Sequence, residues 1–366
     1  MHPQPPPLTA APHRPPGART LRRRPAPRLP VRAVLAVLAL LAAALCVPGG
    51  AAAAAPAAAA GTFTNPVREG AADPYLTWTD GQYYLTYTQG DHVGIVSSPT
   101  LAGLHEAPEH EVFRDATPDR CCNFWAPELH KFGDRWYLYY GADNGDIGQH
   151  RIHVLEGGAD PLDPYTYKGE LNPGDYNPGI DSTVLEVNGA AYLMWSGWDP
   201  DGQDLFLAKM ASPWELTGPR SKISVPTHDW ELTGGAVNEG PAVLQHDGRT
   251  FIAFSASQCH TPDYKLGLLT LVGADPLDPA AWSKSEQPVF TRNDAAGVFG
   301  PGHNSFFTSP DGTETYNAYH ATADPAGSCG GDRSLRVQKV DWRADGTPDF
   351  GTPAAPGTPL PTPAGE

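Results

Sequence analysis

Five segments of the chain share one pattern of apolar and polar positions. Each has a short apolar run, a turn that contains glycine, and then a second run in which aromatic and aliphatic residues alternate with smaller ones, as in "DSTVLEVNGAAYLMWSG". This pattern is typical of β-hairpins, and sustained helical periodicity is hard to find elsewhere. The five predicted hairpins occupy residues 72–88, 125–141, 181–197, 239–255 and 303–320.

The hairpins recur at a regular interval. Their turn glycines are 52, 56, 59 and 64 residues apart. Repeats of this length that are all β and rich in aromatics are typical of the blades of a β-propeller. We therefore expect an all-β, five-bladed β-propeller that occupies residues 61–350 as a single domain. The tail, residues 351–366, is rich in Pro, Gly and Thr, which predicts disorder.

The first 60 residues have the layout of a secretory signal peptide. Residues 1–32 contain seven arginines and no acid, and the apolar run Ala33–Val47 is followed by an alanine-rich stretch with several cleavage options. The apolar run is short for a membrane span, although an uncleaved anchor is the alternative. We expect residues 1–60 to be a signal and cleavage region, and the mature protein to be secreted with no membrane attachment.

Charge and composition narrow the class of partner. The net charge is −16 at pH 7, and removal of residues 1–60 makes it more negative because that segment contains no acid. An acidic surface disfavours nucleic acid and anionic lipid as partners. The 9 Trp, 14 Tyr and 12 Phe residues suit a sugar-binding protein, but an aromatic β core has a similar composition.

Four cysteines lie in the predicted domain, and in an exported protein they can be oxidised to disulfides. Cys259 and Cys329 lie at similar points in successive repeats, so a bridge between them is plausible. Cys121 and Cys122 are adjacent and a bond between them would close a strained ring, so we expect free thiols there. None of the four has the spacing of zinc ligands.

The heads of the five hairpins carry the candidate chemistry. In a propeller the innermost strand of each blade runs along the central axis, so equivalent positions of all blades converge there. Counting back eight or nine residues from each turn glycine identifies Asp73, Trp125, Asp181, Glu239 and His303. We expect these side chains to surround one shallow cavity, the active site, at the axis. The alternative is that the acids merely form turns at strand ends.

Three carboxylates in one cavity suit the cleavage of a glycosidic bond. Inverting glycosidases use a carboxylic acid and a carboxylate about 6.5–9.5 Å apart, which leaves room for a water. The acid must keep its proton near neutral pH, and a neighbouring carboxylate or partial burial raises its pKa. Trp125 could stack on a sugar ring, although a Trp at this position is also ordinary packing.

The sequence resembles a known family, glycoside hydrolase family 43. Members of this family are five-bladed propellers that act on arabinan, arabinoxylan and xylo-oligosaccharides. The resemblance covers residues 61–350, and its motifs occur in the family's order. They are "NPVREGAADPYL", "WAPELHKFGDRWYLYY", "IDSTVLEVNGAAYLMW", "NEGPAVL", "GPGHNSFF" with "NAYHA", and "DRSLRVQKVDWRADGTP".

The resemblance implies a role for each carboxylate. Asp73, in "ADPY", matches the general base that activates water. Asp181, in "IDST", matches the residue that raises the pKa of the acid and orients it. Glu239, in "NEGP", matches the general acid.

The resemblance also implies two binding residues. His303, in "GPGHNS", matches a histidine that in many members holds a hydrated calcium or other ion at the propeller centre. Calcium prefers oxygen ligands, so a satisfied core histidine is the alternative reading. Arg333 matches an arginine that reaches the site beside the base and the sugar, and Arg336 is the second candidate for that position. Trp125, which its position at the head of a hairpin indicates independently of the resemblance, completes the expected substrate-binding set.

Details of the motifs are most similar to the exo-acting α-L-arabinofuranosidase branch of the family. The expected reaction is release of terminal α-L-arabinofuranose from arabinan or arabino-oligosaccharides of the plant cell wall, with inversion. An endo-arabinanase or a β-xylosidase on the same scaffold is the alternative within the enzymes. A non-catalytic carbohydrate-binding propeller is the alternative from another class, but it would be expected to have lost a carboxylate. The sequence leaves the oligomeric state open.

Overall fold

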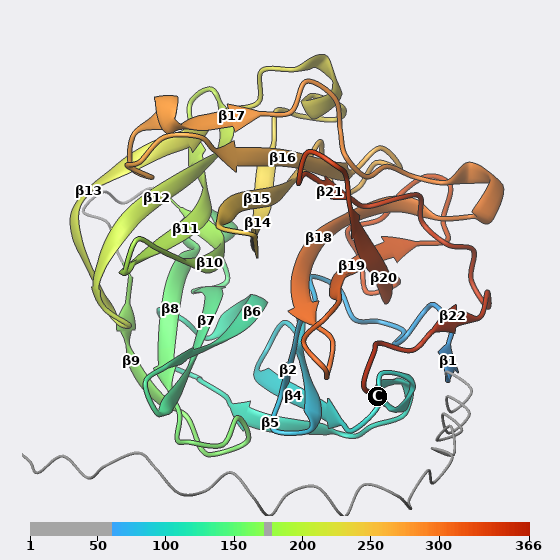
Figure 1. Ribbon diagram of the computed structural model, residues 1–366. Helices are drawn as coiled ribbons and strands as arrows, with labels where there is room; N and C mark the ends of the chain where they lie inside the picture. Colours follow the sequence, from blue (N-terminus) through green and yellow to red (C-terminus); the bar gives the residue numbers. More distant parts are fainter. Residues whose placement is uncertain (1–60, 172–177) are drawn as a thin grey trace, which may run out of the picture. The chain divides into compact units, whose positions relative to one another are not determined.

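The computed structural model describes residues 61–171 and 178–366. The expected signal and cleavage region, residues 1–60, lies outside the described residues. Five four-stranded antiparallel sheets surround a central axis, and each sheet is a meander formed by one continuous stretch of chain (Figure 1). The all-β, five-bladed propeller predicted from the hairpin repeats is confirmed. No helix in these two ranges is both long and apolar enough to cross a membrane.

The blades follow one another in chain order. Blade 1 contains β2 (Tyr75–Thr79), β3 (Gln82–Thr86), β4 (Val93–Ser98) and β5 (Glu109–Phe113). Blade 2 contains β6 (Cys122–Phe132), β7 (Arg135–Asp143), β8 (Arg151–Glu156) and β9 (Thr166–Glu170). Blade 3 contains β10 (Gly179–Val187), β11 (Ala190–Asp199), β12 (Gly202–Ser212) and β13 (Glu215–Ser224). Blade 4 contains β14 (Asn238–His246), β15 (Arg249–Ala256), β16 (Lys265–Leu271) and β17 (Trp282–Lys284). Blade 5 contains β18 (Phe299–Thr308), β19 (Thr315–Thr322), β20 (Ser334–Trp342) and β21 (Pro348–Asp349).

Short 3-10 helices lie in the loops between these strands. They are η1 (Ala102–His105), η2 (Ile147–Gln149), η3 (Asp229–Glu231), η4 (Pro279–Ala281) and η5 (Asp294–Ala296).

Three of the inner hairpins turn where the sequence places Asn-Gly or Asp-Gly. Asn188 and Gly189, between β10 and β11, have φ of 54° and 74°. Positive φ at both central residues is the type I′ geometry, whose twist matches that of the flanking strands. Asp80-Gly81 and Asp247-Gly248 have the same pair of positive φ angles. The turn chemistry therefore sets the register of these hairpins.

The inner strands of a blade use their two faces to fill two different interfaces. In β7, Trp136 and Leu138 face the apolar cluster between blades 1 and 2, whereas Tyr137 and Tyr139 face the cluster between blades 2 and 3. Side chains alternate across a strand with a period of two, so a blade buried on both faces is apolar at nearly every position. Five such clusters occupy the five blade interfaces.

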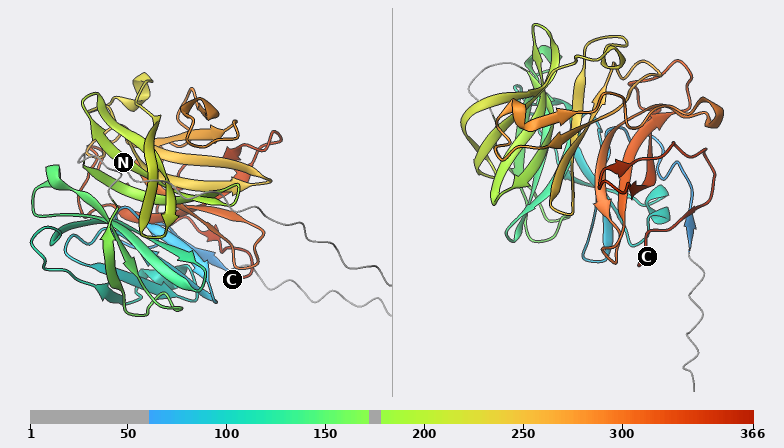
Figure 2. Two further views of the ribbon diagram at one scale, coloured as in Figure 1. Left: turned by 90° about the vertical axis from the view of Figure 1, so that its left-hand side faces the viewer. Right: turned by 45° about the horizontal axis from the view of Figure 1, so that its top comes forward.

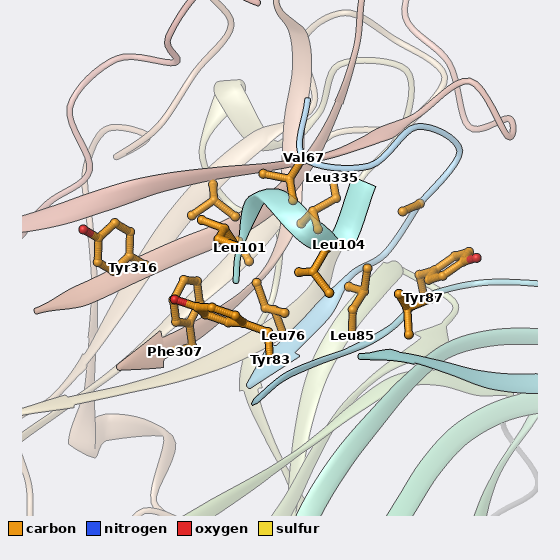
Figure 3. Packing of buried hydrophobic residues seen from close by; sticks show 14 of the residues in the cluster. Val67, Leu76, Tyr83, Leu85, Tyr87, Leu101, Leu104, Phe307, Tyr316 and Leu335 are labelled. Atoms are coloured by element: carbon orange, nitrogen blue, oxygen red, sulfur yellow. The ribbon is translucent and has the colours of Figure 1, made fainter. Parts of the chain in front are cut away.

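The interface between blades 5 and 1 closes the ring. Leu76 and Leu85 of blade 1 pack against Phe307 and Leu335 of blade 5 (Figure 3). Burial of this apolar surface, at roughly 25 cal/mol per Å², holds together side chains of two blades that are more than 200 positions apart in the chain. The two views of Figure 2 show the same ring of sheets from other directions.

The two ends of the propeller chain also meet at this interface. β1 (Thr62–Phe63) pairs antiparallel with β22 (Leu360–Pro361), and the Gly357 N–H donates to the Asn65 carbonyl at 2.8 Å. The tail, residues 351–366, was expected to be disordered; in the structure its residues Leu360–Pro361 form a strand that pairs with Thr62–Phe63. Its composition resembles that of a linker, but composition does not reveal backbone pairing with a segment some 300 residues away.

Candidate active site

The first strands of the five blades, β2, β6, β10, β14 and β18, are neighbours around the axis, where Figure 1 shows them at the centre of the ring. Besides Asn123 and Gly300, which also have positive φ, one residue near the start of each of these strands adopts a left-handed backbone conformation. These residues are Asp73 (φ 54°), Ala126 (φ 43°), Asp181 (φ 57°), Gly240 (φ 51°) and His303 (φ 41°). Such backbone strain in non-glycine residues persists where the surrounding structure enforces it, often at functional sites.

The five side chains predicted for the axis occupy two registers, not one. Asp73, Asp181 and His303 are themselves the left-handed residues. Trp125 and Glu239 lie one position earlier, where they still pair with the neighbouring strand before the ladder is interrupted by a bulge. Counting back from the turns misses this difference because a β-bulge adds a residue to one strand without altering the turn.

Asp73 is held by donors from three directions. Its Oδ1 accepts a hydrogen bond from Arg333 Nη1 at 2.6 Å and lies 3.2 Å from His303 Nδ1, and its Oδ2 accepts one from Thr88 Oγ1 at 2.7 Å. Burial alone would raise the pKa of this carboxyl, but the charges of Arg333 and His303 hold it well below its usual range. Asp73 is therefore ionised at neutral pH.

His320 fixes the backbone beneath Asp73. Its Nδ1 accepts a hydrogen bond from the Asp73 N–H at 3.0 Å. Burial and the neighbouring Arg333 lower the pKa of His320 to about 4, so the ring is neutral and its Nδ1 can act as an acceptor. His320 thus helps to hold Asp73 in its left-handed conformation.

Asp181 lies between the other acids. Its Oδ2 accepts a hydrogen bond from the Gly240 N–H at 3.1 Å and is 3.9 Å from His303 Nδ1. Burial raises the pKa of Asp181 to about 7, with Glu239 and Asp73 acting in the same direction and His303 opposing them. Because a like charge nearby disfavours ionisation, Asp181 and Glu239 compete for protons.

Glu239 is partly exposed, unlike the buried Asp73 and Asp181. Tyr264 Oη donates to its Oε1 at 2.8 Å, and Gln203 Nε2 donates to its Oε2 at 2.7 Å. Burial of the carboxyl group raises its pKa and outweighs these two hydrogen bonds, which favour the charged form. The site therefore holds one ionised carboxylate and, beside it, an accessible carboxyl group whose pKa is raised.

The structure separates the two candidate arginines. Arg333 contacts Asp73. Arg336 is 2% exposed, and its Nε and Nη1 atoms have no hydrogen-bond partner. Tyr319 and Glu69 are the groups whose charges act on it. The arginine beside the candidate base is therefore Arg333.

Trp125 is partly exposed at the head of β6. One face of its indole stacks on the His150 ring, with the centroids 4.5 Å apart, and the buried His150 is bound to the buried Asp143 at 2.9 Å. The packing role and the sugar-stacking role are compatible, because only one face is used by His150. Sugar binding by Trp125 stays a prediction.

The groups around His303 bear on the ion that is expected there. Burial would lower the pKa of His303, but Asp181, Asp73 and Glu239 raise it overall, which favours the doubly protonated imidazole, a form without a lone pair for a metal. In residues 61–171 and 178–366 no group of three or more His, Cys, Asp and Glu side chains could hold a metal ion. The residues do not fit direct coordination of a cation; a hydrated ion stays a prediction, and no step below depends on it.

Both pairs of cysteines are bonded. The expected bridge between Cys259 and Cys329 is present and joins the β15–β16 loop to the β19–β20 loop. The expectation of free thiols at Cys121 and Cys122 was wrong, because these adjacent residues form a disulfide with their Cα atoms 3.7 Å apart. Adjacency alone was a poor guide, since the chain can place two neighbouring sulfurs within bonding distance.

Sequence reasoning missed Gln203, Tyr264, His320 and Thr88. None heads an inner strand; they reach the site from neighbouring strands and loops. His320 ends the fifth hairpin, paired with Gly302, which is the one positional signal that could have indicated it. Gln203 follows the turn sequence Asp-Pro-Asp-Gly and Tyr264 follows Thr-Pro-Asp, but a turn signal does not indicate that the next side chain reaches the site.

The chain is similar to known proteins along most of its length. The model of "Glycosyl hydrolases family 43" matches residues 63–348. An "Extracellular exo-alpha-(1->5)-L-arabinofuranosidase" of Streptomyces avermitilis is 42% identical over 347 residues, which is 90% of this chain and 71% of that protein. A protein of the same name from Streptomyces chartreusis is 40% identical over 315 residues, covering 83% of this chain and 95% of that one.

Among solved structures, the α-L-arabinofuranosidase from Lactobacillus brevis superposes with a TM-score of 0.77 at 34% identity, covering 81% of this chain and 98% of that one. The family match thus spans the propeller and the whole set of axial carboxylates. The protein is a glycoside hydrolase and belongs to glycosyl hydrolases family 43.

Proposed function

We propose that this protein releases terminal α-L-arabinofuranose from arabinan or arabino-oligosaccharides by hydrolysis, with inversion at the anomeric carbon. The observation that carries the proposal is the pairing of an ionised Asp73 with a partly exposed Glu239 whose pKa is raised. The names of the relatives from both Streptomyces species and the neighbouring structure support the choice of sugar.

Asp73 is proposed as the general base. It stays ionised because Arg333 and His303 stabilise its negative charge. A water between this carboxylate and the anomeric carbon would lose a proton to Asp73 as the carbon–oxygen bond to water forms. Thr88 holds the carboxylate and His320 holds the backbone N–H of Asp73, so little reorganisation is needed when the water attacks.

Glu239 is proposed as the general acid. Its proton passes to the glycosidic oxygen as the bond between that oxygen and the anomeric carbon breaks, so the leaving group departs as a neutral alcohol. Asp181 is proposed as the pKa modulator, because its carboxyl group lies next to the Glu239–Gly240 backbone and competes for the same proton. The products are arabinose of inverted configuration and a shortened chain.

Secretion is part of the proposal. Relatives from Streptomyces are named extracellular, and residues 1–60 have the sequence layout of a signal and cleavage region. Intact-mass measurement of protein recovered from the culture medium should find a chain that begins within or just after the alanine-rich stretch. Recovery of the full-length chain in the membrane fraction would favour an uncleaved anchor.

Product analysis separates the proposal from its alternatives. Incubation with linear arabinan, branched arabinan and xylo-oligosaccharides should release monomeric arabinose from the arabinans from the first time points, and proton NMR should show the β-anomer before mutarotation. Early appearance of longer arabino-oligosaccharides would indicate an endo-arabinanase, and release of xylose a β-xylosidase. Binding without any product would indicate a carbohydrate-binding propeller.

A further inference from the structure

Gln203, near the start of β12, is a buried amide that no step above uses. It is 5% exposed. Its Nε2 lies 2.7 Å from Glu239 Oε2 and 2.9 Å from Ser196 Oγ. Ser196 is fully buried and lies 2.8 Å from the backbone carbonyl oxygen of Asn238, the residue directly before Glu239. A closed chain of contacts therefore runs from the backbone of the acid to its own side chain.

Hydrogen-bond polarity fixes the direction of this chain. A carbonyl oxygen only accepts, so the single Ser196 hydroxyl proton points at the Asn238 carbonyl. Toward Gln203 the hydroxyl can then only accept, which requires the amide nitrogen, and not the amide oxygen, to face Ser196. The second hydrogen of that NH₂ group points at Glu239 Oε2.

The two oxygens of Glu239 are therefore not equivalent. An amide nitrogen has no acceptor capacity, so a proton on Oε2 would face another hydrogen. A phenol hydroxyl both donates and accepts, so Tyr264 can remain bonded to Oε1 when that oxygen carries a proton.

We infer that Gln203 is a positioning residue that keeps Oε2 of Glu239 unprotonated and so assigns the acidic proton to Oε1, with Ser196 fixing the orientation of the amide. The inference deepens the proposed function, because it rests on Glu239 being the general acid. Gln203 acts through Glu239 and touches neither the water nor the sugar in this scheme.

The other groups that act on Glu239 come from separate elements. Asp73 precedes β2, Asp181 lies in β10, His303 lies in β18 and Tyr264 precedes β16. Loss of the Gln203 amide leaves these groups in place and removes one donor that favours the carboxylate. The pKa of Glu239 should then rise, and the basic limb of the pH profile of kcat/KM should move to higher pH.

The test variant is Gln203→Met, which keeps the side-chain length and removes the N–H groups. Aryl α-L-arabinofuranosides with a graded series of leaving groups are the substrates. A hydrogen bond to a charged group contributes enough for about 10- to 100-fold in rate, so we expect a loss of that order for the poorest leaving group and a smaller loss for the most activated phenol. The basic limb should move upward.

Gln338→Met is the matched control. Gln338 is partly buried in blade 5, and its amide donates to the backbone carbonyls of Phe350 and Thr352. Its replacement removes a comparable set of hydrogen bonds away from the carboxylates. We expect its pH profile and leaving-group dependence to equal those of the unsubstituted protein.

Ser196→Ala tests the relay separately and remains informative if Gln203→Met does not fold. Without the hydroxyl the amide can turn, so part of the Gln203→Met effect should appear. In the Gln203→Met background the same change should add no further movement of the basic limb. Additive effects, or a Gln203→Met profile and leaving-group dependence equal to those of the unsubstituted protein, would overturn the inference.

Failure of the inference differs from failure of the proposed function. In one outcome, Glu239→Gln loses activity mainly on poor leaving groups while Gln203→Met and Ser196→Ala behave like Gln338→Met. That result would support Glu239 as the general acid and contradict the positioning role of Gln203. If Glu239→Gln itself shows no dependence on the leaving group, Glu239 is not the acid and both fall.

Discussion

Arg333 donates a hydrogen bond from Nη1 to Asp73 Oδ1 at 2.6 Å, although 260 positions separate the two residues. The contact joins the loop before β20 in blade 5 to the segment before β2 in blade 1. Closure of the ring therefore also completes the environment of the proposed base. A guanidinium beside a buried carboxylate stabilises its charged form.

Replacement of Arg333 by Met should shift the acidic limb of the pH profile. Without the guanidinium the pKa of Asp73 rises, so a smaller fraction of the base is ionised at low pH and the acidic limb of kcat/KM moves to higher pH. At the optimum we expect a loss of about 10- to 100-fold, as for removal of a hydrogen bond to a charged group.

Arg343→Met is the control for this change, because Arg343 pairs with Asp349 at an exposed position of blade 5. Its pH profile should be unaltered. An Arg333→Met profile whose acidic limb stays in place would contradict the assignment of Asp73 as the ionised base.

Asp181→Asn should shift the basic limb of the pH profile of kcat/KM. The Asp181 carboxylate repels the charge of Glu239, so its neutralisation lowers the pKa of the acid and brings the basic limb of kcat/KM to lower pH. The Asn side chain can still accept the hydrogen bond from the Gly240 N–H. The pH profiles of the two proteins, measured with one aryl arabinofuranoside, check the direction; a basic limb that moves upward would refute the modulator role.

Gly240→Ala should lower both the stability of the protein and its kcat. Gly240 has φ of 51°, and a Cβ built there would lie 3.1 Å from Cγ of His303. A side chain would strain the backbone and press on the ring that faces Asp73 and Asp181. We expect a loss of stability of about 1 kcal/mol or more and a fall in kcat that exceeds the change in KM.

Gly248→Ala is the matched control for backbone strain. Gly248 has φ of 73° in a hairpin turn, where an added Cβ meets nothing within 4 Å. It should lose stability but keep kcat. Equal kcat values for the two variants would show that the space beside His303 has no bearing on catalysis.

The Cys259–Cys329 disulfide should stabilise the fold. It closes a long loop between two successive blades. We expect its removal to lower the free energy of unfolding by roughly 2–5 kcal/mol, as is typical of native disulfides. The double variant Cys259→Ser/Cys329→Ser should therefore unfold at lower denaturant concentration. Cys121→Ser/Cys122→Ser is the contrast, since a bond between adjacent residues restricts little of the unfolded chain. An equal loss in both would argue against the loop-closure explanation.

Much of the architecture could be predicted because it depends on local patterns. Asn188-Gly189 and its counterparts mark the hairpins, and their regular spacing indicates the blades. The placement of Asp73 and Asp181 at the axis followed from propeller symmetry. The register of Glu239 did not, because it depends on bulges that leave no mark in the turn sequence.

The features that the sequence did not predict are contacts between distant parts of the chain. Gln203 and Tyr264 act on Glu239 from outside its own strand, and the strand Leu360–Pro361 is ordered by pairing with Thr62–Phe63. Periodicity and composition describe a segment by itself. They do not describe the partner that it meets after folding.

The central claim is that Glu239 donates the proton that lets the leaving group depart. Glu239→Gln keeps the shape and removes the proton, and its kcat/KM is to be measured on aryl α-L-arabinofuranosides whose phenols span a wide range of pKa. We predict a loss on the order of 10²–10⁴-fold for poor leaving groups that shrinks steadily as the phenol becomes more acidic. A loss of the same size across the whole series would contradict the account.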